Sequence, residues 1–189
     1  MSRLDIIAGP NGAGKTTLFE LVIEPARPGL PFVNADRIAS QRWPGEELAH
    51  SYEAASIAAA TRSQLIDARL DFCTETVFSH ESKLSLVVDA EAAGSDIVMH
   101  VVVIPLKLSG PRVTARVDGE GHTVPAEKIA DRYSRLWTLV ATALKHCRLV
   151  VFYDNSHDDG PIEVASRRRG TFDYPPRSPG WAPEALTSL

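Results

Sequence analysis

The stretch Gly9-Pro10-Asn11-Gly12-Ala13-Gly14-Lys15-Thr16 decides the fold class, because it matches the pattern GxxxxGK[ST] at every fixed position. An apolar run, Leu4–Ala8, precedes it, and a segment able to form a helix, Thr17–Val22, follows it. In this context the glycines let backbone N–H groups surround a phosphate chain, and the start of the helix adds its positive dipole end. An ordinary glycine-rich turn is the alternative, and it explains neither flanking element.

The loop predicts ATP and Mg²⁺ as cofactors. We expect Lys15 to reach the β- and γ-phosphates and the Thr16 hydroxyl to ligate Mg²⁺. The predicted nucleotide contacts are Gly9, Pro10, Asn11, Gly12, Ala13, Gly14, Lys15, Thr16 and Thr17.

Length and composition limit the remaining classes. The 189 residues predict one domain, 1–189, and the net charge of −4 is not that of a nucleic-acid-binding surface. No apolar stretch is long enough to span a membrane. The first apolar run begins too early for a signal peptide, so we expect a cytoplasmic protein. Cys73 and Cys147 have no metal or redox spacing, and we expect both to be buried thiols.

Apolar runs alternate with helical patterns along the chain, which predicts an α/β fold: a P-loop NTPase three-layer sandwich with a mostly parallel five-stranded sheet and a helical lid. The predicted strands are Leu4–Ala8, Phe32–Asn34, Asp71–Glu75, Ile97–Ile104 and Arg148–Asp154. The main predicted helices are Glu46–Arg69, Ser82–Ala93 and Pro125–Lys145. A proline-rich C-terminal tail, about 157–189, is expected to be irregular, with one short strand near Phe172.

Two carboxylates follow predicted strands and should lie near the nucleotide, because ligands of open α/β sheets bind beyond the carboxyl ends of the strands. Asp36 is the candidate base that takes the proton of an acceptor hydroxyl, with a helix N-cap as the alternative role. Glu75 is the candidate to hold Mg²⁺ through water or to fix the acceptor. Its alternative role is that of a hydrogen-bonded carboxylate at a strand end.

Basic residues on two helical stripes predict a lid over the transferring phosphate, at about 106–124. Arg112 and Arg116 are four residues apart, and Arg132 and Arg135 belong to a second stripe together with Lys128. The stretch between the stripes contains Gly119-Glu120-Gly121-His122, which can act as a flexible joint. A pair of solvated basic faces is the alternative.

Five blocks of this sequence together resemble the zeta-toxin family of P-loop kinases. They are IIAGPNGAGKTTL (6–18), FVNADRIA (32–39), DFCTETVFS (71–79), RVTARVDGEGHTVPAEKIADRYSR (112–135) and VFYDNS (151–156). The resemblance implies ATP- and Mg²⁺-dependent phosphorylation of the 3′-hydroxyl of UDP-N-acetylglucosamine by the toxin of a toxin–antitoxin pair. Compact relatives usually have Gly-Gly-His where this chain has Gly119-Glu120-Gly121-His122, on the acceptor side of the site.

The resemblance also assigns roles to individual residues. It implies that Asp36 is the base, and that Lys15 and Thr16 serve the phosphates and Mg²⁺. It places the lid arginines at Arg116 and Arg132, with Arg112 and Arg135, one helical turn away, as the alternates. The expected acceptor contacts are Asp36, Glu75, Thr76, Arg112, His122 and Arg135, and the expected metal ligands are Thr16 and Glu75.

The sequence therefore predicts a kinase whose acceptor is a UDP-sugar, with an antitoxin protein as a partner and neither nucleic acid nor membrane. Two alternatives stay open. One is a small-metabolite or polynucleotide kinase of the same fold, and the other is a nucleotide-switched binding module without transfer activity.

Overall fold

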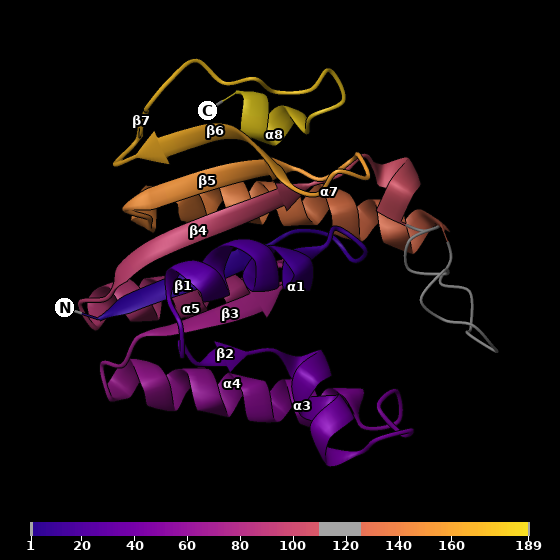
Figure 1. The fold of residues 1–189 in the computed structure, drawn as a ribbon, viewed down its shortest axis with the longest axis vertical. Coiled ribbons are helices and arrows are strands. Elements are labelled where there is room, and N and C mark those ends of the chain that lie inside the picture. The colour runs from indigo at the N-terminus through magenta and orange to yellow at the C-terminus, as the bar shows by residue number, and fades with distance from the viewer. Residues whose placement is uncertain (1, 110–125, 189) are drawn as a thin grey trace.

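The computed structural model describes residues 2–109 and 126–188, with backbone only for 126–130. A seven-stranded sheet forms its centre, in the order β2-β3-β1-β4-β5-β6-β7 (Figure 1). The five strands β1 to β5 are parallel, and β6 and β7 are antiparallel to their neighbours. The strands are β1 (Arg3–Ala8), β2 (Phe32–Val33), β3 (Phe72–Thr76), β4 (Asp96–Val103), β5 (Leu149–Asp154), β6 (Ile162–Arg168) and β7 (Thr171–Phe172).

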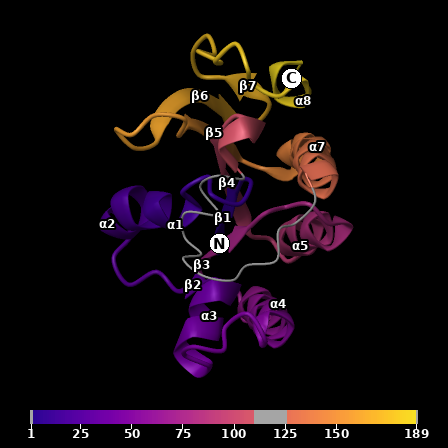
Figure 2. The same ribbon diagram turned by 90° about the vertical axis from the view of Figure 1, so that its right-hand side faces the viewer.

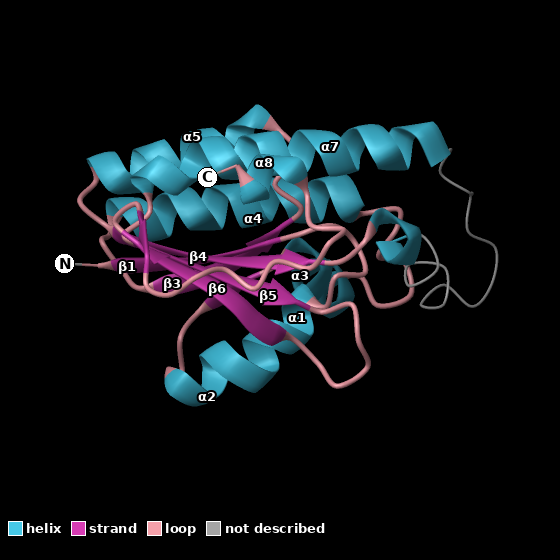
Figure 3. Ribbon diagram, turned by 90° about the horizontal axis from the view of Figure 1, so that it is seen from above, coloured by secondary structure: helices cyan, strands magenta, loops and turns pink. Residues whose placement is uncertain are grey.

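Helices cover both faces of the sheet, which confirms the predicted three-layer α/β architecture (Figure 3). One face carries the helices that follow β2, β3 and β4, and the other carries the helix that follows β1 (Figure 2). Alternate residues of one strand belong to the two cores, because side chains of a strand point to opposite faces. Ile6 packs in the core below the long helices, whereas its neighbour Ile7 packs with Leu18 and Phe19.

The prediction of five strands is wrong, because the supposedly irregular tail adds two more. β6 pairs with β5, from Leu149↔Arg168 to Asp154↔Ile162. Arg169 (φ 47°) and Gly170 (φ 88°) then form a two-residue turn into β7, and positive φ at both positions is typical of a tight hairpin. Phe172, where a short strand was expected, lies in β7.

The main helices agree in place with the sequence prediction and differ at their ends. The helical elements are α1 (Lys15–Leu18), η1 (Phe19–Ile23), α2 (Glu24–Ala26), α3 (Ala35–Arg42), α4 (Ser51–Asp67), α5 (Glu81–Ala92), α7 (Ala126–Ala143), η2 (Leu144–His146) and α8 (Glu184–Thr187). Residues 106–109 are also helical. In the described residues, no helix combines the length and the apolar character needed to cross a membrane.

The helix α4 begins five residues later than predicted, because residues 47–50 form turns instead of helix. Its buried positions are Ala54, Ala58, Arg62 and Ile66, spaced four residues apart on one stripe. Three of them are apolar, whereas Arg62 is a charged side chain on the buried side of the helix.

Candidate functional site

The phosphate-binding loop between β1 and α1 requires glycine at two positions. A Cβ atom at Gly9 would lie 2.5 Å from the carbonyl oxygen of Val102 in β4, so no side chain fits there. Gly14 has a φ of 82°, and a Cβ on it would lie 2.3 Å from Nδ2 of Asn155. These contacts keep the loop backbone close to β4 and to the end of β5.

Glu75, at the end of β3, connects the loop to the next strand. Its Oε2 accepts 2.7 Å hydrogen bonds from the Thr16 hydroxyl and from Nδ2 of Asn34, and its Oε1 lies 3.7 Å from Nζ of Lys15. Lys15 is 5% exposed and also donates a 3.0 Å hydrogen bond to the carbonyl of Pro10. Glu75 is thus the hydrogen-bonded strand-end carboxylate considered as its alternative role, and its role toward Mg²⁺ or the acceptor stays a prediction.

Asn34, rather than Asp36, is the N-cap of α3. Its Oδ1 accepts hydrogen bonds from the backbone N–H groups of Asp36 (2.7 Å) and Arg37 (3.1 Å). The capping role considered for Asp36 is therefore wrong. The Asp36 carboxylate instead lies in the first turn of α3, exposed and on the wall of a cavity.

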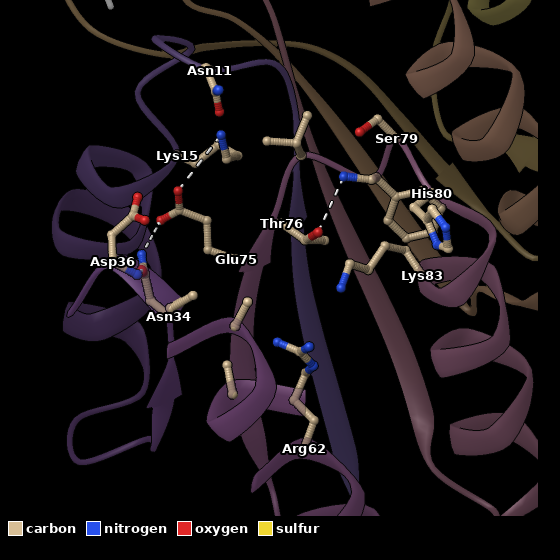
Figure 4. A pocket seen from close by; sticks show the side chains of 15 residues that line it. Asn11, Lys15, Asn34, Asp36, Arg62, Glu75, Thr76, Ser79, His80 and Lys83 are labelled. Atoms are coloured by element: carbon tan, nitrogen blue, oxygen red, sulfur yellow. Dashed lines mark hydrogen bonds and ion pairs between the residues drawn. The ribbon is translucent and has the colours of Figure 1, made fainter. Parts of the chain in front are cut away.

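This cavity, of about 280 Å³, lies beside the loop and is the candidate active site (Figure 4). It receives side chains from the loop, the ends of β2 and β3, and the helices α3, α4 and α5. The lining residues are Asn11, Lys15, Asn34, Ala35, Asp36, Ala55, Ala58, Arg62, Glu75, Thr76, Val77, Phe78, Ser79, His80 and Lys83. Of the residues predicted from the sequence, it brings together Asn11, Lys15, Asp36, Glu75 and Thr76.

Two basic side chains in the cavity were not among the predicted site residues. Arg62 of α4 is 7% exposed, and burial lowers the pKa of its guanidinium. Lys83 of α5 is partly exposed, and burial together with the nearby charge of Arg62 lowers the pKa of its ammonium group. In Figure 4 both side chains point into the cavity, on the side away from Lys15 and Glu75.

Two of the residues that were not predicted have a signal in the sequence. Arg62 occupies a buried position of the α4 stripe, where a charged residue is unusual. Asn34 directly precedes a helix, which is the usual place of an N-cap. Asn155 follows β5, and its Nδ2 donates a 2.8 Å hydrogen bond to the carbonyl of Ala13 in the loop. No local signal predicts the contact between Asn155 and Ala13, which lie 142 residues apart.

Three residues predicted for the lid, Arg112, Arg116 and His122, lie outside the described residues. Arg132 and Arg135 lie on α7, where both side chains are exposed and neither lines the cavity. Two hydrogen bonds connect the described residues on either side of 110–125 to the rest of the fold. Ser109 donates to the carbonyl of Asn11 (3.0 Å), and the Tyr133 hydroxyl donates to the carbonyl of Ile104 (2.8 Å).

The residues present suit a nucleotide with Mg²⁺. Val102 and Asn155 occupy the places of a Cβ at Gly9 and Gly14, so the loop keeps a side-chain-free backbone at both positions, as a phosphate-binding loop requires. Lys15 supplies a positive charge there. The hydroxyl of Thr16 and the carboxylate of Glu75 are oxygen ligands of the kind Mg²⁺ prefers, with phosphate oxygens and water completing its shell.

Comparisons with known proteins agree with this geometry. Among protein families, the one described as "Zeta toxin" matches residues 3–158. A search of curated proteins finds no match.

Solved structures share the fold at low sequence identity. The complex of AvrRxo1-ORF1 and -ORF2 with ATP matches with a TM-score of 0.68 and 17% identity, over 92% of this chain and 60% of that one. The PezAT chromosomal toxin–antitoxin system of Streptococcus pneumoniae matches with a TM-score of 0.66 and 13% identity, over 88% and 72%. Shikimate kinase from Acinetobacter baumannii, in complex with shikimate, matches with a TM-score of 0.52 and 15% identity, over 85% and 86%. The chain thus spans about three fifths of the AvrRxo1-ORF1:-ORF2 chain that it matches.

Proposed function

Because the chain belongs to the zeta toxin family of P-loop kinases, we propose that it transfers the γ-phosphate of ATP to a hydroxyl of a small acceptor. The acceptor that we propose is a UDP-activated amino sugar, UDP-N-acetylglucosamine, phosphorylated at its 3′-hydroxyl. The observation that supports transfer is the cavity itself, where the phosphate-binding residue Lys15 and the carboxylate of Asp36 line one space. A nucleotide switch without transfer activity needs no carboxylate beside the γ-phosphate.

In the proposed reaction, the acceptor oxygen attacks the γ-phosphorus and the bond from that phosphorus to the β,γ-bridging oxygen breaks, which releases ADP. Asp36 takes the proton of the acceptor hydroxyl. Lys15 and the loop N–H groups stabilise the charge on the β- and γ-phosphates, and Glu75 fixes Lys15 and Thr16 in place. Mg²⁺, held by Thr16 and Glu75, would neutralise charge on the same phosphates.

The toxin role and the antitoxin partner come from the family and from the PezAT system, a toxin–antitoxin pair with the same fold. We propose that this chain is the toxin of such a pair and acts in the cytoplasm, where ATP is available. Its activity should then be toxic when it is produced without its partner.

The experiment is a product assay with a panel of acceptors. The purified protein is incubated with ATP, Mg²⁺ and one of UDP-N-acetylglucosamine, UDP-glucose, N-acetylglucosamine, shikimate or a 5′-hydroxyl oligonucleotide. Mass spectrometry should detect a product heavier by one phosphate only with UDP-N-acetylglucosamine, and no such product with Asp36→Asn. A product with shikimate or with the oligonucleotide instead would replace the proposed acceptor, and ATP binding without any product would favour the binding module.

A further inference from the structure

Arg62 is a buried cation that the proposed reaction does not use. It lies on the inward stripe of α4 between Ala58 and Ile66, is 7% exposed, and points into the cavity (Figure 4). Within residues 2–109 and 131–188, no carboxylate forms an ion pair with its guanidinium and no other group accepts a hydrogen bond from it. Burial lowers the pKa of this guanidinium.

Lys83 increases this positive charge instead of neutralising it. It is the third residue of α5 and lines the same cavity as Arg62. Its pKa is lowered by burial and by the charge of Arg62, so the two cations lie close enough to repel each other. The two carboxylates of the cavity lie elsewhere on its wall, where Glu75 interacts with Lys15, Thr16 and Asn34.

Placing two like charges together, one of them buried, destabilises a fold unless an anion compensates them. An apolar side chain at this position would make the fold more stable, since the other buried residues of this α4 stripe are apolar. Because Arg62 has no partner among the described residues, its charge points to a ligand rather than to stability.

We propose that Arg62 and Lys83 form an anion subsite that binds a phosphate or diphosphate group of the acceptor. This rests on the proposed function, because it assigns the acceptor a phosphorylated portion in addition to the hydroxyl that Asp36 deprotonates. The guanidinium fork binds phosphate oxygens in pairs, and Lys83 adds a second charge. Two cations suit a diphosphate better than the single charge of a carboxylate.

The cavity has the shape that this requires. Lys15 and Glu75 occupy one side of it, Arg62 and Lys83 point in from the other, and the Asp36 carboxylate faces the same space (Figure 4). At about 280 Å³ it is near the lower end of small-molecule sites, so it would hold the acceptor portion of a reaction complex rather than a macromolecule. An acceptor anchored by its phosphate at Arg62 could present its hydroxyl to Asp36.

The test measures acceptor binding without transfer. The protein is first saturated with AMP-PNP and Mg²⁺, which fill the phosphate-binding loop, and is then titrated with UDP by calorimetry. Arg62→Met and Lys83→Met should each weaken UDP binding by about tenfold or more, because each removes charged hydrogen bonds to the diphosphate. Affinity for AMP-PNP should stay within a few-fold, and Arg62→Lys should retain part of the UDP binding.

The controls separate this subsite from a structural role. Arg42→Gln, at an exposed position at the end of α3, should leave UDP binding unchanged. Arg62→Met should keep or raise the thermal midpoint of unfolding, because it removes a buried charge that no described residue pairs with. If the role of Arg62 were structural, the same substitution would lower the midpoint. Lys83 is partly exposed, so Lys83→Met gives the same readout if Arg62→Met fails to fold.

Three results would overturn the proposal. They are wild-type UDP affinity in both variants, no UDP binding by the wild-type protein, and stronger Arg62-dependent binding of shikimate, a carboxylate, than of UDP. The proposed function fails separately. If UDP binding depends on Arg62 but no UDP-sugar is phosphorylated, transfer is refuted and the subsite stands. If the UDP-sugar is phosphorylated but Arg62→Met and Lys83→Met both bind UDP as the wild type does, only the subsite is refuted.

Discussion

The side chain of Asn155 donates a 2.8 Å hydrogen bond to the carbonyl of Ala13, and so connects the end of β5 to the phosphate-binding loop. The same nitrogen lies 2.3 Å from the place that a Cβ of Gly14 would take. Asn155 itself is buried. The position of the loop thus depends on a residue that follows the last parallel strand, far from the loop in sequence.

We predict that Asn155→Ala weakens ATP binding by about tenfold, because the Ala13 carbonyl loses a buried partner and the loop is less well ordered before ATP binds. ATP affinity is measured by calorimetry in the presence of Mg²⁺. The neighbouring substitution Ser156→Ala is the control and should have no effect, since its side chain makes no hydrogen bond in the described residues. Equal ATP affinity in the two variants would mean that the loop holds its shape without Asn155.

Lys15→Ala should lower turnover by about 10²-fold or more, a change of at least about 2.7 kcal/mol in the barrier. The reason is that Lys15 places a buried positive charge against the phosphates. Steady-state kinetics with the acceptor identified in the product assay provide the measurement. Glu20→Gln, an exposed position in η1, serves as the control. Full activity of Lys15→Ala would refute the role assigned to the loop.

Asp36→Asn should abolish transfer to the acceptor and leave ATP affinity within a few-fold, because it keeps the size of the side chain and removes the base. The fold should be unaffected, since Asn34 rather than Asp36 caps α3 and the Asp36 side chain is exposed. Turnover and ATP affinity are measured in parallel, with the exposed Asp67→Asn of α4 as the control. If turnover and ATP affinity both fall, Asp36 acts in Mg²⁺ binding rather than as the base.

Arg132 and Arg135 test the lid prediction within the described residues. Both are exposed on α7, so replacing either by Ala should change stability by no more than about 0.5 kcal/mol. If Arg132 acts on the transferring phosphate, Arg132→Ala should lower turnover by about 10³-fold, and Lys should restore little of it. If turnover falls in Arg135→Ala and not in Arg132→Ala, the lid arginine lies about one helical turn from Arg132. If both variants turn over at the wild-type rate, neither arginine of α7 acts in the reaction.

Much of the fold was predictable because it depends on local patterns. The motif at 9–16 and the continuously apolar run of β4 indicate a P-loop and a covered parallel sheet without any knowledge of long-range contacts. The rule that ligands lie beyond the carboxyl ends of parallel strands also placed Asp36 and Glu75 at one edge, and both line the same cavity. Their chemical roles stay predictions.

The missed features depend on tertiary contacts. The segment Ile162–Arg168 has exposed residues at both ends and an arginine run, so it lacks the apolar pattern of a strand, and pairing with β5 makes it one. In the sequence, Arg62 cannot be told from a surface arginine of a helix, because only the packing of α4 shows that its position is buried. The cation pair Arg62–Lys83 requires α4 and α5 to lie against one cavity, which no spacing within either helix predicts.

Asp5 provides the last prediction, on the dependence of stability on pH. Its carboxylate is fully buried in β1 and accepts hydrogen bonds from Arg3 (2.6 Å), from Arg27 and, when His100 carries a proton on Nε2, from that ring (3.0 Å). Burial alone would raise the pKa of Asp5, but the interactions with His100 and Arg3 outweigh it, so the pKa lies below its ordinary value of 3.8.

A lowered pKa means that the unfolded chain binds the proton more readily than the native protein does. The stability that Asp5 contributes is therefore complete above the unfolded-state pKa near 3.8, and it is lost as the pH falls through the native pKa. Asp5→Asn should lower the free energy of unfolding by about 3 kcal/mol at neutral pH, because it removes the buried charge that pairs with the partly buried Arg3 and Arg27. Urea unfolding between about pH 7 and pH 2 measures it, and the difference from wild type should narrow below about pH 4. The exposed Asp89→Asn of α5 is the control and should follow the wild-type curve. A difference that stays constant over this range would show that the loss comes from altered packing of the side chain rather than from its charge.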